Sequence, residues 1–148
     1  PESVTFGGNS LALDTKRIEA LFTKRLITVT SGDIILDDDI ALRKLRSKCF
    51  LLFGQEGKNQ FAEEISILPQ AYKIIRHLYQ IRKYGNNAES PAELCKRGFA
   101  INRSTISNRI AEILKICKKR NATAILHKFP SDKWGLNPVL SCCNPSRR

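Results

Sequence analysis

The stretch SPAELCKRGFAINRSTISNRIAEILK, residues 90–115, decides how the second half of this chain folds. Ser90 precedes Pro91, and Glu93 follows Ser90 by three residues, which is the pattern of a capping box with proline at the first helical position. Gly98 tolerates the left-handed backbone that ends a helix, so this helix is expected to end near Arg97. The pattern therefore predicts a short helix followed by a tight turn.

A second helix is expected directly after this turn, with Asn102 as its N-cap. Its apolar residues recur every three or four positions and form one stripe of an amphipathic helix. These residues are Ile106, Ile110, Ile113, Leu114 and Cys117. The side chains outside the stripe are small, hydrogen-bonding or cationic, and such side chains can approach base edges and phosphates. Together the two helices predict a helix-turn-helix, with a recognition helix over about residues 103–116.

The segment from Ile65 to Phe129 resembles the DNA-binding domain of LuxR/FixJ-type transcription regulators. The residues at matching places are Ser90, Glu93, Leu94, Cys95, Phe99, Ile101, Asn102, Thr105, Ile106, Arg109, Ile110, Ile113, Leu114 and Lys115. The run Arg120-Asn121-Ala122-Thr123 is similar to the one that opens the fourth helix of that family. The chain departs from the pattern in the longer connection over residues 79–87. The resemblance implies an all-α four-helix domain that binds double-stranded DNA sequence-specifically and regulates transcription.

This resemblance also implies roles for individual residues. The residues expected to contact DNA are Arg103, Ser104, Thr105, Ser107, Asn108, Arg109, Ala111 and Lys115. Ser107, Asn108 and Ala111 correspond to base-facing positions, and the others are expected mainly to hold phosphates. Arg109 replaces a histidine of the family, and packing beneath the helix is an alternative for its side chain.

A dimer contact is implied as well. The family's fourth helix, which corresponds to residues 121–129 here, often forms that contact. The resemblance therefore implies a homodimer, with contacts from Ala124, Ile125 and Lys128.

The net charge of +11 is distributed unevenly over the 148 residues. Residues 1–66 carry 9 Lys/Arg against 10 Asp/Glu, a net of −1, whereas residues 67–148 carry 16 against 4, a net of +12. The basic charge thus belongs to the half that contains the helix-turn-helix, as expected of a nucleic-acid-binding protein. A basic surface that is simply solvated is the alternative.

The first 60 residues predict a small mixed α/β segment, faintly similar to the PAS-like sensory segment of many LuxR-type regulators. Four elements are expected in chain order: a helix over residues 14–24, a β-hairpin of residues 26–29 and 34–36, a helix opened by the aspartates at 37–39, and a buried strand over residues 49–53. The predicted fold class is α+β. Its parts are a sensory or dimerisation segment over residues 1–60, where a small molecule or protein signal could bind, a helix-turn-helix domain over 65–129 and a tail over 130–148.

Motifs for catalysis are missing from the sequence. It contains no G-x-S-x-G, no glycine-rich phosphate loop and no His–Cys pair at a recognisable spacing, so we expect neither an enzyme nor a cofactor. The five cysteines form no Cys-x-x-Cys pair, and we expect no metal site. The adjacent Cys142 and Cys143 leave a redox or metal role open beside the alternative of a disordered tail. No apolar run is long enough to span a bilayer, and a cytoplasmic protein is expected.

Two other functions remain open. A helix-turn-helix fold can dock a protein partner without touching DNA, because a fold does not fix a function. An RNA-binding module is a further alternative, but single-stranded RNA is usually bound by stacking on aromatic side chains, and only Phe99 lies near the basic stretch.

Overall fold

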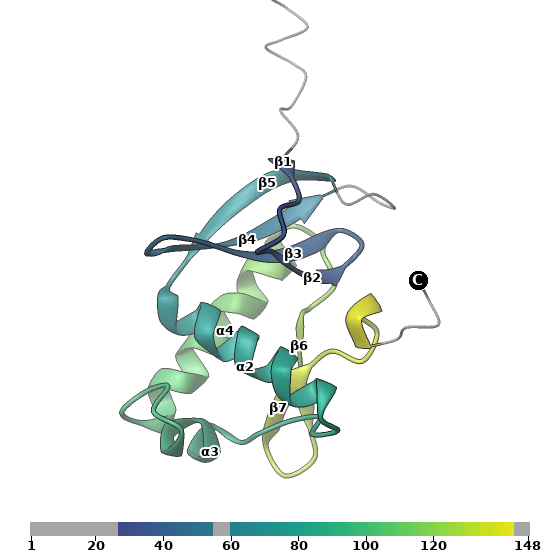
Figure 1. Ribbon diagram of the computed structural model, residues 1–148. Helices are drawn as coiled ribbons and strands as arrows, with labels where there is room; N and C mark the ends of the chain where they lie inside the picture. The colour runs from purple at the N-terminus through teal and green to yellow at the C-terminus, as the bar shows by residue number, and fades with distance from the viewer. Residues whose placement is uncertain (1–26, 55–59, 144–148) are drawn as a thin grey trace, which may run out of the picture.

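An antiparallel β-sheet, three helices and a β-hairpin make up the computed structural model, which describes residues 27–54 and 60–143 (Figure 1). The elements in chain order are β1 (Ile27–Thr28), β2 (Ile34–Asp37), β3 (Ile40–Leu45), β4 (Lys48–Gly54), β5 (Gln60–Ile67), α2 (Pro69–Lys83), α3 (Pro91–Lys96), α4 (Arg103–Lys119), β6 (Leu126–Phe129), β7 (Lys133–Leu136) and the 3-10 helix η1 (Ser141–Cys143). No helix in the described part of the chain is both long and apolar enough to cross a lipid bilayer. The helix expected over residues 14–24 lies outside the described residues.

The sheet has the strand order β1-β5-β4-β3-β2, and every neighbouring pair is antiparallel. Because successive side chains of a strand point to opposite faces, β3 and β4 supply apolar residues to both sides of the sheet. Leu42 and Leu51, which are paired across β3 and β4, belong to the large core on the helical side. Ala41 and Leu52 pack with Phe61 in a smaller cluster on the other face. The sheet is therefore covered by apolar contacts on both faces.

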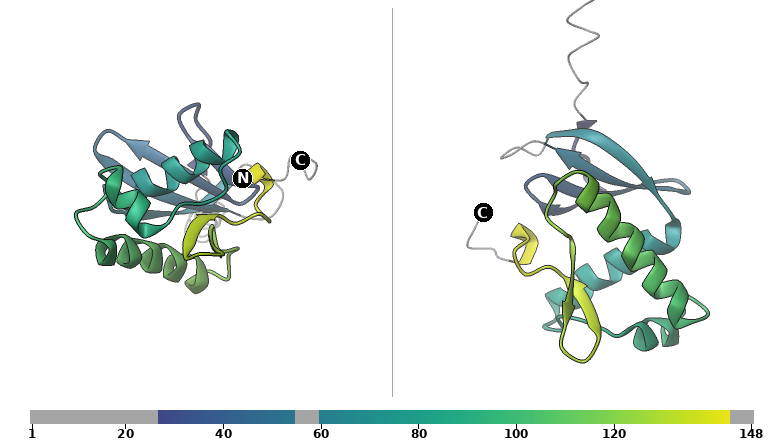
Figure 2. Two further views of the ribbon diagram at one scale, coloured as in Figure 1. Left: turned by 90° about the horizontal axis from the view of Figure 1, so that it is seen from below. Right: turned by 180° about the vertical axis from the view of Figure 1, so that it is seen from behind.

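One hydrophobic core runs from the sheet through the helices to the β6–β7 hairpin. The helices α2 and α4 lie below the sheet, and the hairpin lies beside α4 (Figures 1 and 2). The apolar stripe of α4 is buried as the sequence predicts, with Ile106 and Ile113 fully buried and Ile110 2% exposed. The expected strand over residues 49–53 is confirmed as β4.

The local signals of the helix-turn-helix are present as hydrogen bonds. The Glu93 backbone N–H donates to Ser90 Oγ at 3.1 Å, and the Ser90 N–H donates to Glu93 Oε1 at 2.8 Å. The bond from the Ser90 N–H holds the pKa of Glu93 below its usual value. Gly98 has φ +88° directly after the C-cap of α3, and the Thr105 N–H donates to Asn102 Oδ1 at 2.9 Å at the start of α4. Both caps and the glycine turn are confirmed.

The expected all-α four-helix domain is wrong, because a strand stands in place of its fourth helix. Asn121 has φ +51°, and the Ala122 N–H donates back to the Cys117 carbonyl at 3.0 Å, so Asn121 ends α4 and does not begin another helix. Residues Leu126–Phe129 then form β6, which pairs with β7. We name the β6–β7 hairpin, residues 126–136, the wing. Its second strand lies within the segment 130–148 that the sequence predicts as a tail.

The helix expected after the aspartates at 37–39 is also wrong. Residues Ile40–Leu45 form the strand β3, which lies between β4 and β2 in the sheet. Ile40, Ala41 and Leu42 are all fully buried because both faces of the sheet are covered at this point. A continuous apolar run of this length is compatible with a buried helix and with a strand buried on both faces, so periodicity cannot separate the two.

The strand pairing expected at the N-terminal end is wrong as well. The turn over residues 30–33 exists, since the Asp33 N–H donates to the Thr30 carbonyl at 3.1 Å. The strands that flank it do not pair with each other: β1 pairs with β5, and β2 pairs with β3. A turn signal specifies a local reversal of the chain, whereas the partner of each strand depends on contacts with distant residues.

Candidate functional site

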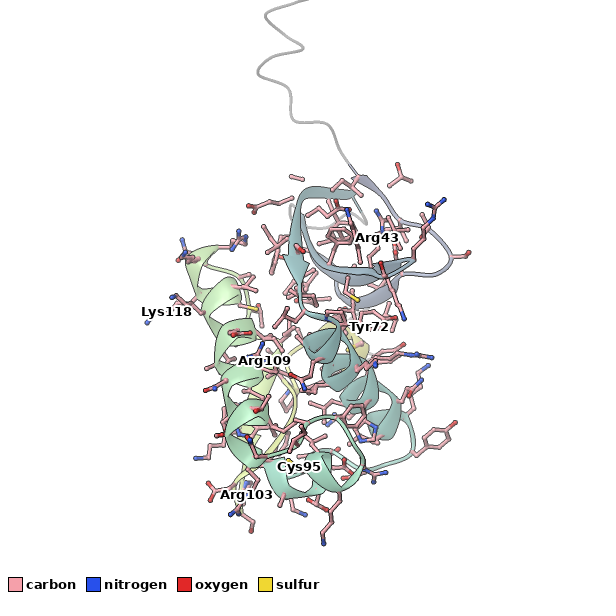
Figure 3. The ribbon with its side chains drawn as sticks, turned by 90° about the vertical axis from the view of Figure 1, so that its left-hand side faces the viewer. Arg43, Tyr72, Cys95, Arg103, Arg109 and Lys118 are labelled. Atoms are coloured by element: carbon pink, nitrogen blue, oxygen red, sulfur yellow. The ribbon has the colours of Figure 1, made fainter. Side chains whose placement is uncertain are left out.

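The outward face of α4 carries most of the residues that the sequence predicts for DNA binding. Six of the eight are exposed to solvent: Arg103, Ser104, Ser107, Asn108, Ala111 and Lys115. Arg103 and Lys118 lie near opposite ends of this helix (Figure 3). The middle of the face is therefore uncharged and made of small or amide side chains, while cations stand at both ends.

Thr105 is half-buried and takes part in the cap of α4. Its backbone N–H and its hydroxyl both donate to Asn102 Oδ1 at 2.9 Å, and the Ser104 hydroxyl donates to the same oxygen at 2.7 Å. These three bonds fix the first turn of α4. Both hydroxyls are thereby held at the start of the helix, where they support the exposed face that follows.

Arg109 lies on the flank of α4 that faces α2. Its side chain is only 17% exposed, and its Nη1 forms an ion pair with Glu112 Oε1 at 3.2 Å. Its Nε is buried and has no hydrogen-bond partner among the described residues. Protein thus covers most of the guanidinium, in contrast to the exposed Arg103.

A groove with a volume of about 640 Å³ lies on the opposite flank of α4, between this helix, the start of α3 and the wing. Its lining residues are Ser90, Pro91, Ala92, Arg103, Ser107, Lys128, Ser131, Asp132 and Trp134. Lys128 forms an ion pair with Asp132 at 3.1 Å, and both side chains are well exposed. An exposed pair of this kind is weak and gives way easily to a competing anion. The groove combines two cations with hydroxyl groups, which is the chemistry that binds phosphate.

The wing is held in place through its second strand. Glu89, between α2 and α3, forms an isolated antiparallel bridge with Trp134. The buried Glu89 carboxylate contacts His77 Nε2 at 2.7 Å and accepts hydrogen bonds from the Arg97 guanidinium, with Arg97 Nε at 2.8 Å from Oε1. Because His77 belongs to α2 and Arg97 caps α3, this carboxylate connects both helices to the strand that carries the groove wall.

Gly135 allows the close approach of the wing to this segment. A Cβ atom at Gly135 would lie 1.8 Å from the carbonyl oxygen of Asn87. No side chain fits in that space, so the glycine is required by packing and not by an unusual backbone angle.

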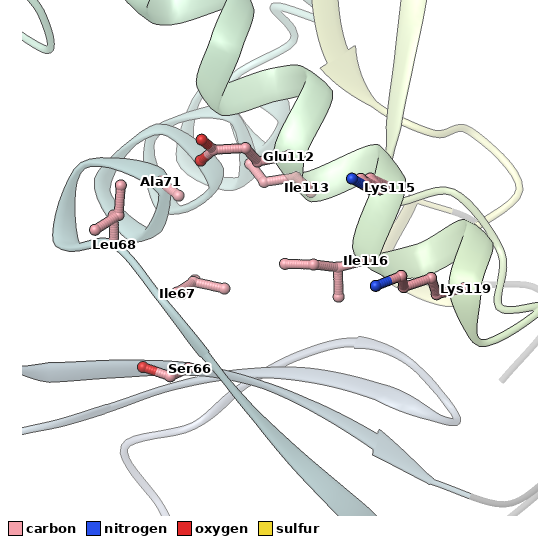
Figure 4. Close-up of a pocket in the computed structure, with 9 residues that line it drawn as sticks. All are labelled: Ser66, Ile67, Leu68, Ala71, Glu112, Ile113, Lys115, Ile116 and Lys119. Atoms are coloured by element: carbon pink, nitrogen blue, oxygen red, sulfur yellow. The ribbon is translucent and has the colours of Figure 1, made fainter.

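A second groove, of about 320 Å³, lies between the C-terminal half of α4 and the junction of β5 with α2 (Figure 4). Its floor is apolar and includes Ala71, Ile113 and Ile116. Leu68 at its edge is 48% exposed, and Lys115 and Lys119 also line it. Lys115, expected to hold a phosphate, thus stands between the outward face of α4 and an apolar groove.

The residues expected at a dimer contact are not on a helix. Ile125 is fully buried in the core, Ala124 precedes β6, and Lys128 lines the groove of about 640 Å³. The dimer contact was expected because these residues were placed on a fourth helix, and the structure has no helix at this position. The wing, with its exposed His127 and Lys128, was not expected from the sequence. The sequence pattern that indicates this hairpin is a pair of short apolar runs on either side of the turn Pro130-Ser131-Asp132.

No protein-family model, curated protein sequence or solved structure matches this chain.

Proposed function

We propose that this chain is a sequence-specific double-stranded DNA-binding protein that regulates transcription, with α4 in the major groove and the wing on the adjacent phosphate backbone. The observation that supports the proposal most directly is the groove of about 640 Å³. It brings Arg103 of α4 and Lys128 of the wing to one concave surface, although 25 positions separate them in the sequence. Two cations on one surface can contact the phosphates of a nucleic-acid backbone.

The distribution of side chains along α4 supports the same function. A helix of 17 residues is about 25 Å long, and the major groove of B-DNA, about 12 Å wide, admits one α-helix. Uncharged Ser107, Asn108 and Ala111 occupy the middle of the exposed face, where base edges would lie. An asparagine amide can bond adenine through two atoms, so Asn108 is the best candidate for reading sequence. The cations at the ends of this face and on the wing would then bind the phosphate backbone of the DNA.

A homodimer on DNA remains part of the proposal on general grounds. A single helix-turn-helix reads only a few base pairs, and dimers gain specificity from two half-sites about one helical turn apart.

Fluorescence anisotropy with a random 20-base-pair duplex at several salt concentrations tests the proposal. The full chain should bind at low salt, and the double variant Arg103→Ala/Lys128→Ala should bind more weakly and show a salt slope about two units shallower. Lys73→Ala is the matched control because Lys73 is an exposed cation on α2, outside both grooves. Absence of binding at low salt, or an equal loss in the control, would overturn the proposal. If the full chain binds duplex DNA, selection from a random oligonucleotide library identifies its preferred sequence.

The apolar groove beside Lys115 favours a second candidate function, docking of a protein partner. The occupant that fits it is an amphipathic segment with acidic side chains, because Leu68 and Ile116 offer apolar contact and Lys115 and Lys119 offer positive charge. Leu68→Asp should abolish binding of such a peptide and leave DNA binding unchanged. If the chain binds no duplex DNA and this variant abolishes peptide binding, the second function replaces the first.

A further inference from the structure

Cys142 and Cys143 place two thiols in contact at the C-terminal end of the described chain. Their sulfur atoms are 3.8 Å apart, and both side chains are partly exposed. Both belong to η1, and the groove of about 640 Å³ includes neither of them. The pair is therefore separate from the surface proposed for DNA.

The folded body holds this pair in place. The Ser141 N–H donates to Asp37 Oδ1 at 3.1 Å, and Asp37 is a buried residue at the end of β2. The Cys143 N–H donates to the carbonyl of the fully buried Leu140 at 3.0 Å. The bond to Asp37 connects η1 to the sheet, and the bond to Leu140 closes its turn, so the two thiols keep a defined position relative to each other.

The five cysteines differ in their chemical environments. Burial raises the pKa of the thiols of Cys49 and Cys117, which disfavours their reactive thiolate forms. The hydrogen bond with the Cys142 thiol lowers the pKa of Cys143 to about 7, against the effect of burial and with help from the positive charge of Arg82. Near neutral pH a thiol is nucleophilic to the extent that it is ionised, and an attacking thiol works best when its pKa lies near the ambient pH.

We propose that Cys142 and Cys143 form a site of reversible thiol–disulfide exchange with low-molecular-weight disulfides, in which Cys143 is the attacking thiol and Cys142 the resolving thiol. In the first step the Cys143 thiolate attacks one sulfur of the disulfide, a new sulfur–sulfur bond joins Cys143 to that half, and the other half leaves as a thiolate. In the second step Cys142 loses its proton to solvent and attacks the Cys143 sulfur. The bound half then leaves as a second thiolate. The two cysteines are oxidised by two electrons, and the small disulfide is reduced to two thiols.

The disulfide formed between Cys142 and Cys143 is readily reduced by other thiols. Adjacent Cα atoms lie about 3.8 Å apart across a trans peptide, which is below the span of about 4.4–6.8 Å that a disulfide usually bridges. A disulfide between neighbours is therefore strained, and strained disulfides are the easily reduced ones. Lasting metal binding is a poorer fit, because the described residues contain no group of three or more His, Cys, Asp or Glu side chains placed to hold an ion.

Incubation of the full reduced chain with oxidised glutathione at pH 7, followed by peptide mass spectrometry over time, tests this proposal. Cys143 should be modified first, about tenfold faster than Cys95, the matched control because it is the other partly exposed cysteine. Cys142→Ser should trap the glutathione adduct on Cys143, whereas the wild-type adduct should be released as the two cysteines join. Cys143→Ser should slow modification of the pair about tenfold. Circular dichroism of each serine variant verifies that it is folded.

Three results would overturn the proposal. Modification of Cys95 at the same rate as Cys143 would remove the selectivity. An unchanged rate in Cys143→Ser would remove its role as the attacking thiol. A glutathione adduct equally long-lived in the wild type and in Cys142→Ser would remove the resolving role of Cys142.

Discussion

Glu89 and Trp134 form two reciprocal backbone hydrogen bonds: the Glu89 N–H donates to the Trp134 carbonyl at 2.9 Å, and the Trp134 N–H donates to the Glu89 carbonyl at 2.8 Å. This bridge attaches the wing to the segment between α2 and α3. The groove that contains Arg103 and Lys128 exists only while the wing stays attached, because Lys128 lies on β6 and β6 is paired with β7. The shape of the groove between α4 and the wing therefore depends on the stability of the Glu89–Trp134 bridge.

The first prediction concerns Gly135. Gly135→Ala should destabilise the chain by about 1–3 kcal/mol, because the new Cβ atom would overlap the Asn87 carbonyl oxygen and push the wing outward. Urea denaturation measures the free energy of unfolding, and hydrogen exchange should show faster exchange at the amide of Trp134. Gly32→Ala is the control, since a Cβ atom there would meet nothing within 4 Å. Equal stability of the two variants would contradict the packing described at Gly135.

The second prediction concerns the buried carboxylate of Glu89. Glu89→Gln keeps the shape of the side chain but removes the charge that His77 and Arg97 contact, and it should lower the free energy of unfolding by about 1–3 kcal/mol. Asp132→Asn is the control because both side chains of its ion pair with Lys128 are well exposed. That change should stay within about 0.5 kcal/mol of the wild type. A loss as large in the control would show that burial of Glu89 does not matter.

The third prediction concerns acid stability. Asp33 accepts hydrogen bonds from Arg43 Nε at 2.9 Å and from the Thr30 N–H at 2.9 Å. Although burial favours its neutral form, these bonds hold the pKa of Asp33 below its usual value. A carboxyl whose folded pKa lies below its unfolded pKa of about 4 stabilises the fold fully above pH 4 and loses that contribution as the pH falls further.

Asp33→Asn should therefore be less stable than the wild type at pH 7, by about 1–3 kcal/mol, and the difference should shrink below pH 4. Thermal unfolding followed by circular dichroism between pH 2.5 and 7 measures both quantities. Asp38→Asn serves as the control because Asp38 is an exposed neighbour in the same region. A difference that stays constant over the whole pH range would contradict the role given to Asp33.

The fourth prediction separates base reading from phosphate contact. Asn108→Ala should weaken binding to the selected DNA site by about 1–3 kcal/mol and leave binding to random DNA nearly unchanged. Lys128→Ala should weaken both equally and reduce the salt slope by about one unit. Anisotropy titrations on selected and random duplexes measure all four affinities. If Asn108→Ala leaves both affinities unchanged in a folded protein, α4 is not the element that reads sequence.

The sequence alone was sufficient to predict those features that depend on residues close together in the chain. The capping box of Ser90 and Glu93, the glycine turn at Gly98 and the Asn102 cap each depend on residues within a few positions, and all three were predicted correctly. The buried stripe of α4 follows from a 3.6-residue period, which the order of residues displays directly. The exposed face of α4, with Arg103, Ser107 and Asn108, follows from the same period.

Only the tertiary structure decided which distant segments pair. The run Ile40–Leu42 became a strand because apolar groups cover both of its faces, and β1 found its partner in β5 across more than thirty residues. Leu126–Phe129 became the first strand of the wing because β7 pairs with it and β7 is in turn bridged to Glu89. Such pairings depend on contacts between residues far apart in the chain, which no local pattern records. The groove shared by α4 and the wing has the same origin, and it therefore appears only in three dimensions.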